Sequence, residues 1–500
     1  MKPYADLDAT ALAAAHRARE RTVRSSVDAA LAGVDALDRR LGILLDVQRD
    51  AARARADELD RALLRGEPAG PLFGVPVVLK ANMCLAGVET NCASRMLAGW
   101  KPPYTATFVQ RLLDAGAVVI GMANMDEFAM GSSSENSAFF PSKNPWDETR
   151  TPGGSSSGSA VAVASGLVPI SLGSDTGGSV RQPAALCNVL GYKPTYGTIS
   201  RYGLVAFGSS LDQVSPFARS VRDLELVTSV ISGADPMDST CFDAPPFERA
   251  ADGSGRLDGL RVGVPREHFA GGLDAAVRTA CERALETLRG LGAELVPVSL
   301  PHTELAIPTY YVVATAEASS NLARFDGVRY GLRKEGTGSL QSMFGATRAA
   351  GFGPEVKRRI LLGTYVLSAG YYDAWYGRAL KVRSLLRRDF EQAFEHVDVL
   401  AGPTSPTAAF RLGEKKDDPV AMYLADVLTV PVSLAGLPAI SVPCGCVEES
   451  GTRLPVGLQF VGRARGDARL LAVARAYESA TGFARERAPL HVANVKGGAA

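Results

Sequence analysis

The residues of this chain that are best suited to chemistry are one lysine and the serines of two glycine-rich segments. Ser155 lies in GGSSSGS at 153–159, Ser179 lies 24 residues later in SDTGGS at 174–179, and Lys80 follows the apolar run VPVVL. A serine hydroxyl is a weak nucleophile and needs a base, and burial can lower the pKa of a lysine until it accepts a proton. A second serine can relay that proton, because a hydroxyl both donates and accepts hydrogen bonds. The three residues predict a Ser-Ser-Lys relay that attacks an amide carbonyl.

The segment before Ser179 also has the composition of an oxyanion-binding loop. Consecutive glycines let the backbone turn tightly and leave several N–H groups free to point at one place. We expect the N–H groups of Thr176, Gly177 and Gly178, with that of Ser179, to bind the tetrahedral intermediate. Loss of one such donor typically costs about 3 kcal/mol in acyl transfer. Ser179 is expected to open a helix, whose positive end would favour the same anion.

Short apolar runs and helical segments alternate along the chain and must position these residues. Strands are predicted at 75–79, 117–120, 167–172, 260–264, 294–298, 397–401, 440–442 and 458–461, with helices at 106–115, 158–165, 274–291 and 467–480. Such alternation predicts an α/β fold with one mixed, mostly parallel sheet covered by helices on both faces. Residues 1–66 are predicted to be an N-terminal helical layer, 67–488 a single catalytic domain with a helical cap at 305–395, and 489–500 a disordered tail.

Composition excludes several classes of protein. The 500 residues include 54 basic and 53 acidic side chains, so nothing drives general attraction to nucleic acid, and any RNA is expected to be held by a partner. Seven scattered cysteines without a CxxC pair predict a reduced, cytoplasmic protein and no metal site. The N-terminus lacks a signal-peptide core. Prolines interrupt the apolar window 428–446, so no membrane span is expected.

Other readings of the reactive segments stay open. Five histidines are present, none close in sequence to either loop, although folding could still assemble a Ser-His-Asp triad. Cys187 could be a cysteine nucleophile, but a buried helix residue is the simpler interpretation. Gly/Ser-rich segments are often linkers, but linkers are not flanked by apolar elements as these are. A phosphate loop is disfavoured because GxxxxGK[ST] is absent.

At these residues the chain resembles the amidase signature family. The resemblance covers nearly the whole chain, including Gly74–Lys80, 121–128, 152–159, 175–183 and 191–197. It implies that Ser179 is the acyl-enzyme nucleophile, that Ser155 follows a cis peptide bond and bridges to the base, and that Lys80 is the base. The family usually has aspartate after the lysine, where this chain has Ala81, and the loss of a carboxylate there would ease deprotonation of Lys80 if it pointed inward.

Segments 126–137, 317–327, 356–374 and 422–426 further resemble one branch, the A subunits of glutamyl-tRNA(Gln) amidotransferases. That resemblance implies hydrolysis of L-glutamine through a glutamyl-enzyme. It places Arg359 on the substrate α-carboxylate, Asp426 on its α-ammonium and Tyr310 in the pocket wall. A zwitterion requires one fixed cation and one fixed anion, and arginine can hold a carboxylate through two hydrogen bonds.

The same resemblance implies a heterotrimer with B- and C-type subunits. This chain would need no cofactor, while the B-type partner would use ATP and Mg²⁺ and hold Glu-tRNA(Gln). Two alternatives remain: a stand-alone amidase acting on simple or aryl amides, and an inactive scaffold. Arg359 and Asp426 disfavour the first, because an apolar amide needs no zwitterion clamp, and the intact Lys80, Ser155 and Ser179 disfavour the second.

Overall fold

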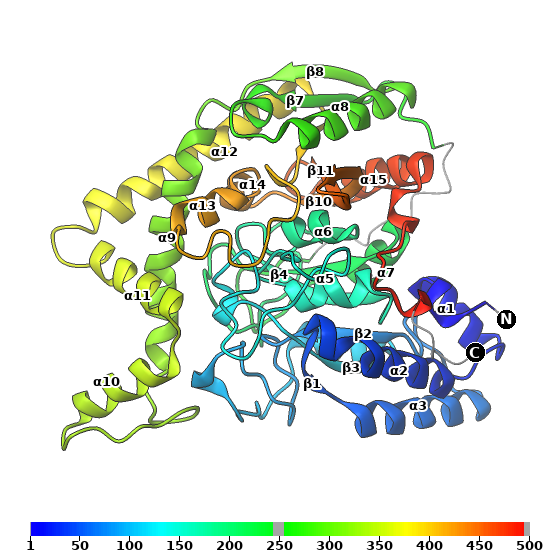
Figure 1. Cartoon of the computed structure of the whole chain (residues 1–500), viewed down its shortest axis with the longest axis horizontal. Coiled ribbons are helices and arrows are strands. Elements are labelled where there is room, and N and C mark those ends of the chain that lie inside the picture. Colours follow the sequence, from blue (N-terminus) through cyan, green and yellow to red (C-terminus); the bar gives the residue numbers. More distant parts are fainter. Residues whose placement is uncertain (1, 244–254, 495–500) are drawn as a thin grey trace.

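Strands from both ends of the chain join in one sheet. The computed structural model describes residues 2–243 and 255–494, and within them eleven strands pair in the order β1-β3-β2-β4-β6-β5-β10-β11-β9-β7-β8 (Figure 1). The strands are β1 (Leu44–Val47), β2 (Pro76–Lys80), β3 (Val118–Ala123), β4 (Ile170–Asp175), β5 (Leu190–Lys193), β6 (Gln213–Ala218), β7 (Arg261–Pro265), β8 (Glu294–Val298), β9 (Val399–Pro403), β10 (Ala439–Glu449) and β11 (Thr452–Val461).

Helices surround this sheet, and a group of them extends from it as an arm at the left of Figure 1. Those near the sheet are α1 (Ala9–Arg17), α2 (Val23–Leu41), α3 (Arg49–Leu64), α4 (Thr107–Asp114), α5 (Ser157–Ala164), α6 (Arg181–Cys187), α7 (Val221–Ile231), α8 (Ala275–Gly290), α13 (Pro419–Tyr423), α14 (Val430–Ala435) and α15 (Asp467–Thr481). The arm consists of α9 (Ala306–Asn321), α10 (Leu340–Gly351), α11 (Pro354–Val366) and α12 (Arg378–His396). The expectation of a mainly helical 305–395 is confirmed.

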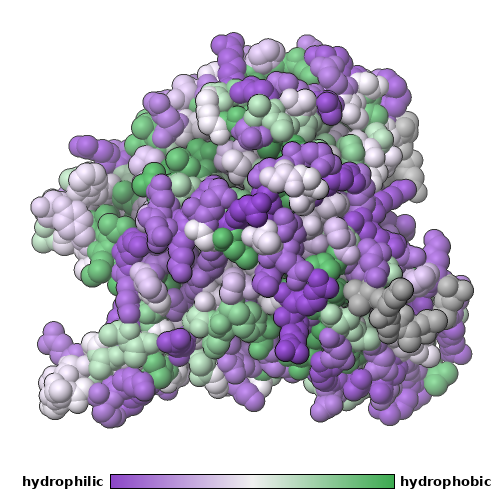
Figure 2. All heavy atoms as spheres, viewed as in Figure 1, coloured by the Kyte–Doolittle hydropathy of each residue, from purple (hydrophilic) through white to green (hydrophobic). Residues whose placement is uncertain are grey.

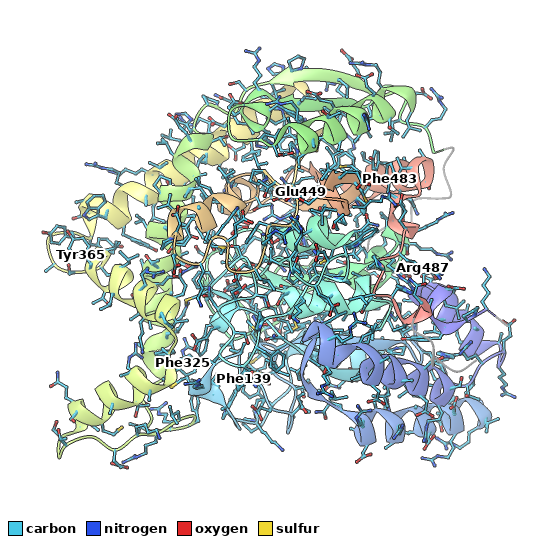
Figure 3. All side chains as sticks on the ribbon, in the orientation of Figure 1. Phe139, Phe325, Tyr365, Glu449, Phe483 and Arg487 are labelled. Atoms are coloured by element: carbon cyan, nitrogen blue, oxygen red, sulfur yellow. The ribbon has the colours of Figure 1, made fainter. Side chains whose placement is uncertain are left out.

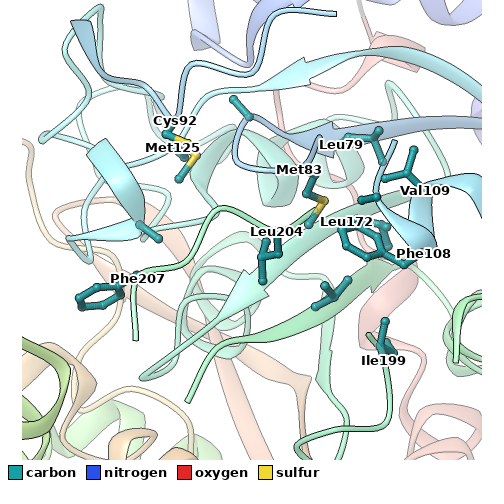
Figure 4. Packing of buried hydrophobic residues seen from close by; sticks show 14 of the residues in the cluster. Leu79, Met83, Cys92, Phe108, Val109, Met125, Leu172, Ile199, Leu204 and Phe207 are labelled. Carbon is teal, nitrogen blue, oxygen red and sulfur yellow. The ribbon is translucent and has the colours of Figure 1, made fainter. Parts of the chain in front are cut away.

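Apolar side chains project from both faces of the sheet, as the predicted α/β fold requires. Val77 and Leu79 of β2 pack in a core with α4 and α7, part of which is seen in Figure 4. Val78, between them, packs on the opposite face in a second core with α2, α3 and α5. Successive side chains of a strand point to opposite faces, so this alternation shows that helices cover both sides.

The sheet is mixed, but the expectation that it is mostly parallel is wrong. Six of the ten strand pairings among the described residues are antiparallel and four are parallel. The longest antiparallel pair is the hairpin of β10 and β11, and β4, β5 and β6 also pair antiparallel. Alternation of strands and helices reveals that a sheet exists, but it does not reveal the direction in which each strand runs.

Two local expectations also need correction. The N-terminal part predicted as a helical layer contains α1, α2 and α3, but it also contains β1, which pairs antiparallel with β3 at the sheet edge. β1 is short and only Leu44 in it is buried, so its sequence carries little strand signal. The strand expected at 167–172 lies at Ile170–Asp175.

The C-terminal residues that the structure describes pack on the body, contrary to the expectation of a disordered tail from 489. Leu490 N donates to Pro145 O and Val492 N donates to Ser165 O, while His491 is buried. Residues 495–500 of the expected tail lie outside the described residues. The face seen in Figure 2 is largely hydrophilic with scattered apolar residues. Among residues 2–243 and 255–494, no helix has the length and apolar character needed to cross a membrane.

A buried ion pair closes the loop between β4 and α6, where Ser179 lies. Arg181 Nε and Nη2 each lie 2.9 Å from a carboxylate oxygen of Asp175, and both side chains are inaccessible to solvent. Arg181 also donates to Thr429 O at 3.0 Å, to Gln459 Oε1 at 2.7 Å and to Ser433 Oγ at 2.7 Å. The arginine thus ties the loop to α14 and β11.

Replacing this arginine is expected to destabilise the whole fold. Arg181→Met leaves Asp175 buried without a counter-charge, and breaking one partner of a buried pair typically costs about 3–5 kcal/mol. The expected result is a clear fall in the midpoint of thermal unfolding, measured by calorimetry at one scan rate. Arg24→Met is the matched control, because Arg24 pairs with Asp28 and Asp57 at the surface, where ion pairs contribute little. Equal losses in the two variants would contradict the structural role of Arg181.

Candidate active site

Lys80 occupies the last position of β2 and points to the face of the sheet that α5 covers. Leu79 and Ala81 on either side of it pack in the core on the other face, so Lys80 is directed towards the serine loop that precedes α5. Lys80 is fully buried. Burial lowers the pKa of Lys80 to about 7, against the opposing effect of the Asp126 and Asp175 carboxylates. The amine is therefore available as a base near neutral pH. Ala81 faces away from this site, so an aspartate at that position would not point at the amine.

Three serine side chains surround the amine. Lys80 Nζ lies 2.7 Å from Ser155 Oγ, 2.8 Å from Ser156 Oγ and 3.0 Å from Ser174 Oγ. Ser156 Oγ donates to Ser174 O at 3.2 Å, so its own proton is already engaged and it serves Lys80 as an acceptor. A neutral amine can donate to Ser156 and Ser174 and receive the Ser155 proton on its lone pair. The contacts of Ser156 and Ser174 were not foreseen from sequence, where nothing distinguishes them from neighbouring serines.

The Ser155 and Ser179 loops are joined through their backbones. The Gly154-Ser155 peptide is cis, as the family resemblance implied. Ser156 N donates to Ser179 O at 3.2 Å, and Gly154 N donates to Gln182 Oε1 at 3.1 Å. Ser155 is fully buried whereas Ser179 is 8% exposed. The structure thus brings Lys80 and Ser155 into direct contact and places Ser179, which solvent can reach, in the adjoining loop.

Close packing explains why the two residues before Ser179 are glycines. Gly178 has φ +143°, and a Cβ there would lie 2.1 Å from Thr429 Oγ1. A Cβ at Gly177 would lie 2.9 Å from the Tyr310 hydroxyl. Within the described part of the chain, the N–H groups of residues 176–179 donate no hydrogen bond, as an oxyanion-binding loop requires. The helix expected to open at Ser179 begins at Arg181 instead.

A cavity of about 560 Å³ lies beside the start of α11, and its lining includes Arg359 and Tyr423. Arg359, on α11, donates from Nε to Glu355 Oε1 at 2.8 Å, and its guanidinium lies over the rings of Phe207 and Tyr311. In residues 2–243 and 255–494 its two terminal amino groups donate to no protein atom. Arg359 can therefore offer both of them to a carboxylate.

Asp426 supplies the complementary negative group. Its Oδ2 accepts a hydrogen bond from Ser132 Oγ, whereas Oδ1 is buried and has no partner among the described residues. Oδ1 lies 3.4 Å from where a Cβ on Gly178 would be, so it faces the glycine loop. Burial raises the pKa of Asp426 to about 7, while the Ser132 hydrogen bond opposes that rise. An unsatisfied buried carboxylate oxygen is costly, and a cationic ligand group would satisfy it.

Cys187 and the histidines, which the sequence left open as an alternative nucleophile and alternative bases, are not placed for catalysis. Cys187 is buried in α6 with Sγ 3.3 Å from Pro152 O, and burial raises the pKa of its thiol. His16 contacts Ser26 and Phe73 O, and His302 contacts Asp389. Across the part of the chain that the structure describes, no histidine hydrogen-bonds to Lys80, Ser155 or Ser179.

Comparison with known proteins agrees with this geometry. The profile of the family described as Amidase matches residues 25–471. The chain is 56% identical over 460 residues to the A subunit of the glutamyl-tRNA(Gln) amidotransferase of Moorella thermoacetica, and the match covers 92% of this chain and 93% of that protein.

Solved structures show the same fold. The crystal structure of the A subunit of the glutamyl-tRNA(Gln) amidotransferase from Thermotoga maritima matches with a TM-score of 0.78 and 40% identity, over 96% of each chain. A peptide amidase in complex with the competitive inhibitor chymostatin matches with a TM-score of 0.83 and 32% identity, over 98% of this chain and 100% of that one. The chain therefore belongs to the amidase family.

Proposed function

We propose that this chain is the glutaminase subunit of a glutamyl-tRNA(Gln) amidotransferase. The observation that carries the proposal is the Lys80–Ser155 contact of 2.7 Å, together with a guanidinium on Arg359 that has free donors and an Asp426 oxygen that has no partner among the described residues. The first pair suits amide hydrolysis, and the second suits a zwitterionic amino acid such as glutamine. Full-length similarity to A subunits at 56% identity supports the same assignment.

The chemistry proceeds in two steps. Ser179 Oγ attacks the side-chain amide carbon of glutamine while its proton passes to Ser155 Oγ and the Ser155 proton passes to Lys80 Nζ. The N–H groups of Thr176, Gly177 and Gly178 stabilise the resulting oxyanion. When the C–N bond breaks, ammonia leaves with the proton returned from Lys80 through Ser155, and a glutamyl ester remains on Ser179. Water then attacks the ester by the same relay and releases glutamate.

Three side chains select the substrate. Arg359 binds the α-carboxylate through its two free amino groups, and Asp426 Oδ1 binds the α-ammonium. Tyr310 lies directly beside Gly177, and we assign it to the wall of the substrate site.

The ammonia is used by a partner. In the proposed heterotrimer, a B-type subunit holds Glu-tRNA(Gln) and activates its glutamate with ATP and Mg²⁺, and a C-type subunit braces the pair. The sequence of this chain has no GxxxxGK[ST] loop and a net charge of only +1, which suits a subunit that leaves nucleotide and tRNA to others. A role in translation places the complex in the cytoplasm.

The decisive experiment measures ammonia release from L-glutamine and from benzamide, with the chain purified in its complex. We expect turnover of glutamine, stimulated by ATP and Glu-tRNA(Gln), and its loss by at least about 10³-fold in Ser179→Ala, because that variant lacks the nucleophile. Ser157→Ala is the matched control, since Ser157 Oγ contacts Asn124 O and not Lys80. Fast benzamide turnover by the chain alone would favour a stand-alone amidase, which the similarity to a peptide amidase keeps as the second candidate.

The protonation state of Lys80 predicts the pH dependence of turnover. Only the neutral amine can accept the Ser155 proton, and the pKa of Lys80 is lowered to about 7. At saturating glutamine, kcat should therefore rise about tenfold per pH unit below pH 7 and level off above it. Lys80→Arg should be inactive throughout, because a guanidinium stays protonated. A kcat of the unaltered protein that rises only near the ordinary pKa of lysine, about 10.4, would contradict a buried neutral base.

The proposed role of Arg359 in binding the α-carboxylate predicts a change confined to substrate binding. Arg359→Ala removes two charge-assisted hydrogen bonds, so KM for glutamine should rise roughly 10- to 100-fold, while KM for benzamide changes little. Arg387→Ala is the control, because Arg387 also lies on a helix of the arm but pairs with Glu391 at the surface. Equal changes for the charged and uncharged substrates in a steady-state assay would refute the assignment of Arg359.

A further inference from the structure

Glu127 is a buried carboxyl group that the proposed reaction does not use. It follows Asp126 after β3 and is 1% exposed. Its Oε1 accepts a hydrogen bond from Ser94 Oγ at 2.5 Å, and its Oε2 accepts one from Gly353 N at 2.8 Å. Both carboxylate oxygens are thus engaged within the protein. Glu127 also lines the cavity that contains Arg359.

The second of these hydrogen bonds lies at the start of the helix that bears Arg359. Gly353 is the N-cap residue of α11 and has no side chain to satisfy the first N–H groups of the helix. Glu127, from another part of the chain, accepts the N–H of Gly353 itself, which has no partner within the helix, and its charge suits the positive end of the helix. A Cβ at Gly353 would lie 2.4 Å from Glu127 Oε2, so the carboxylate occupies the space where a side chain would be.

Aromatic packing surrounds this hydrogen bond. The ring of Phe128, next to Glu127, lies 5.0 Å from that of Phe325 and 5.6 Å from that of Phe352, which precedes Gly353. Figure 3 labels Phe325 at the inner base of the arm and Tyr365 near its outer end. The start of α11 is therefore fixed at the base of the arm.

On its other side Glu127 is connected to the strand that bears Lys80. Phe128 N donates to Cys92 O and Cys92 N donates to Ala81 O, the residue after Lys80, both at 2.9 Å. Cys92, Ala93, Phe128 and Ala129 all have left-handed backbones, with φ between +49° and +62°. Non-glycine residues persist in that strained region only where the surrounding structure fixes them. The segment that presents Glu127 is therefore rigidly attached to β2.

We propose that Glu127 is a positioning residue for glutamine recognition: by capping α11 it sets the place of Arg359 relative to the Lys80–Ser155 pair. Arg359 lies in the second turn of α11 and is held there by Glu355 of the first turn. A shift in the first turn would displace both, and with them the guanidinium that receives the α-carboxylate. This inference rests on the proposed glutaminase function, because it concerns the carboxylate end of the amino-acid substrate.

The test compares variants in the purified complex at about pH 8.5. Burial raises the pKa of Glu127 to about 7, and Arg95 and Lys357 lie near enough to oppose that rise, so the group is ionised in this assay. Glu127→Gln keeps the size of the side chain but places an NH₂ group against one of the two donors. We expect KM for glutamine to rise about tenfold with kcat within about twofold, and no change for benzamide.

A double-variant cycle separates positioning from general damage. In an Arg359→Ala background, Glu127→Gln should raise KM no further, because the group that Glu127 positions is gone. Glu89→Gln is the matched control, since Glu89 accepts from Asn91 in the same region and does not contact α11. Thermal unfolding of each variant checks that the fold is retained.

Three results would each overturn the inference alone: an unchanged KM in Glu127→Gln, equal losses for glutamine and benzamide, or additive effects with Arg359→Ala. Absence of glutamine turnover in the unaltered complex would overturn the proposed function as well, so the two failures are distinguishable.

Discussion

The buried pair of Asp175 and Arg181 is the interaction on which the arrangement of the site depends. It closes the turn that contains Thr176 to Ser179, and through Arg181 it anchors that turn to α14 and β11. The Asp175 carboxylate also opposes the lowering of the Lys80 pKa that burial causes. Burial outweighs the opposing effects of Asp126 and Asp175 on the lysine, while Arg181 gives Asp175 a counter-charge of its own.

The site divides into two parts with different mechanical support. Lys80, Ser155 and Ser179 lie on or next to strands of the sheet and on its tightest loops, where side chains are almost fully buried. Arg359 and Tyr310 come from helices of the arm. Rigid strands suit groups that must transfer protons over hydrogen-bond distances. Helices of an arm can change their surface side chains without disturbing those strands, so substrate preference can vary while the hydrolytic centre stays the same.

Much of the hydrolytic centre was predictable from sequence because its constraints are local. Gly177 and Gly178 signal a tight turn, and the structure shows a steric reason for each. The apolar run before Lys80 predicted burial and hence its lowered pKa. Strand direction, the β1 edge strand and the packed residues 489–494 were not predictable, because they depend on partners distant in sequence. Ser156 and Ser174 became visible only once their distances to Lys80 were known.

Fold similarity by itself does not decide the substrate. The peptide amidase superposes on this chain at least as well as the A subunit from Thermotoga maritima, with TM-scores of 0.83 and 0.78. Both therefore share the sheet on which the catalytic centre is built. What separates an amino-acid substrate from an uncharged amide is a pair of buried opposite charges that keep hydrogen-bonding atoms free of protein partners. Among the described residues of this chain, Arg359 and the Oδ1 atom of Asp426 form such a pair. Leaving them unsatisfied costs free energy in the empty protein, and a zwitterion recovers it on binding. The proposed preference for glutamine therefore rests on these free atoms and not on the fold.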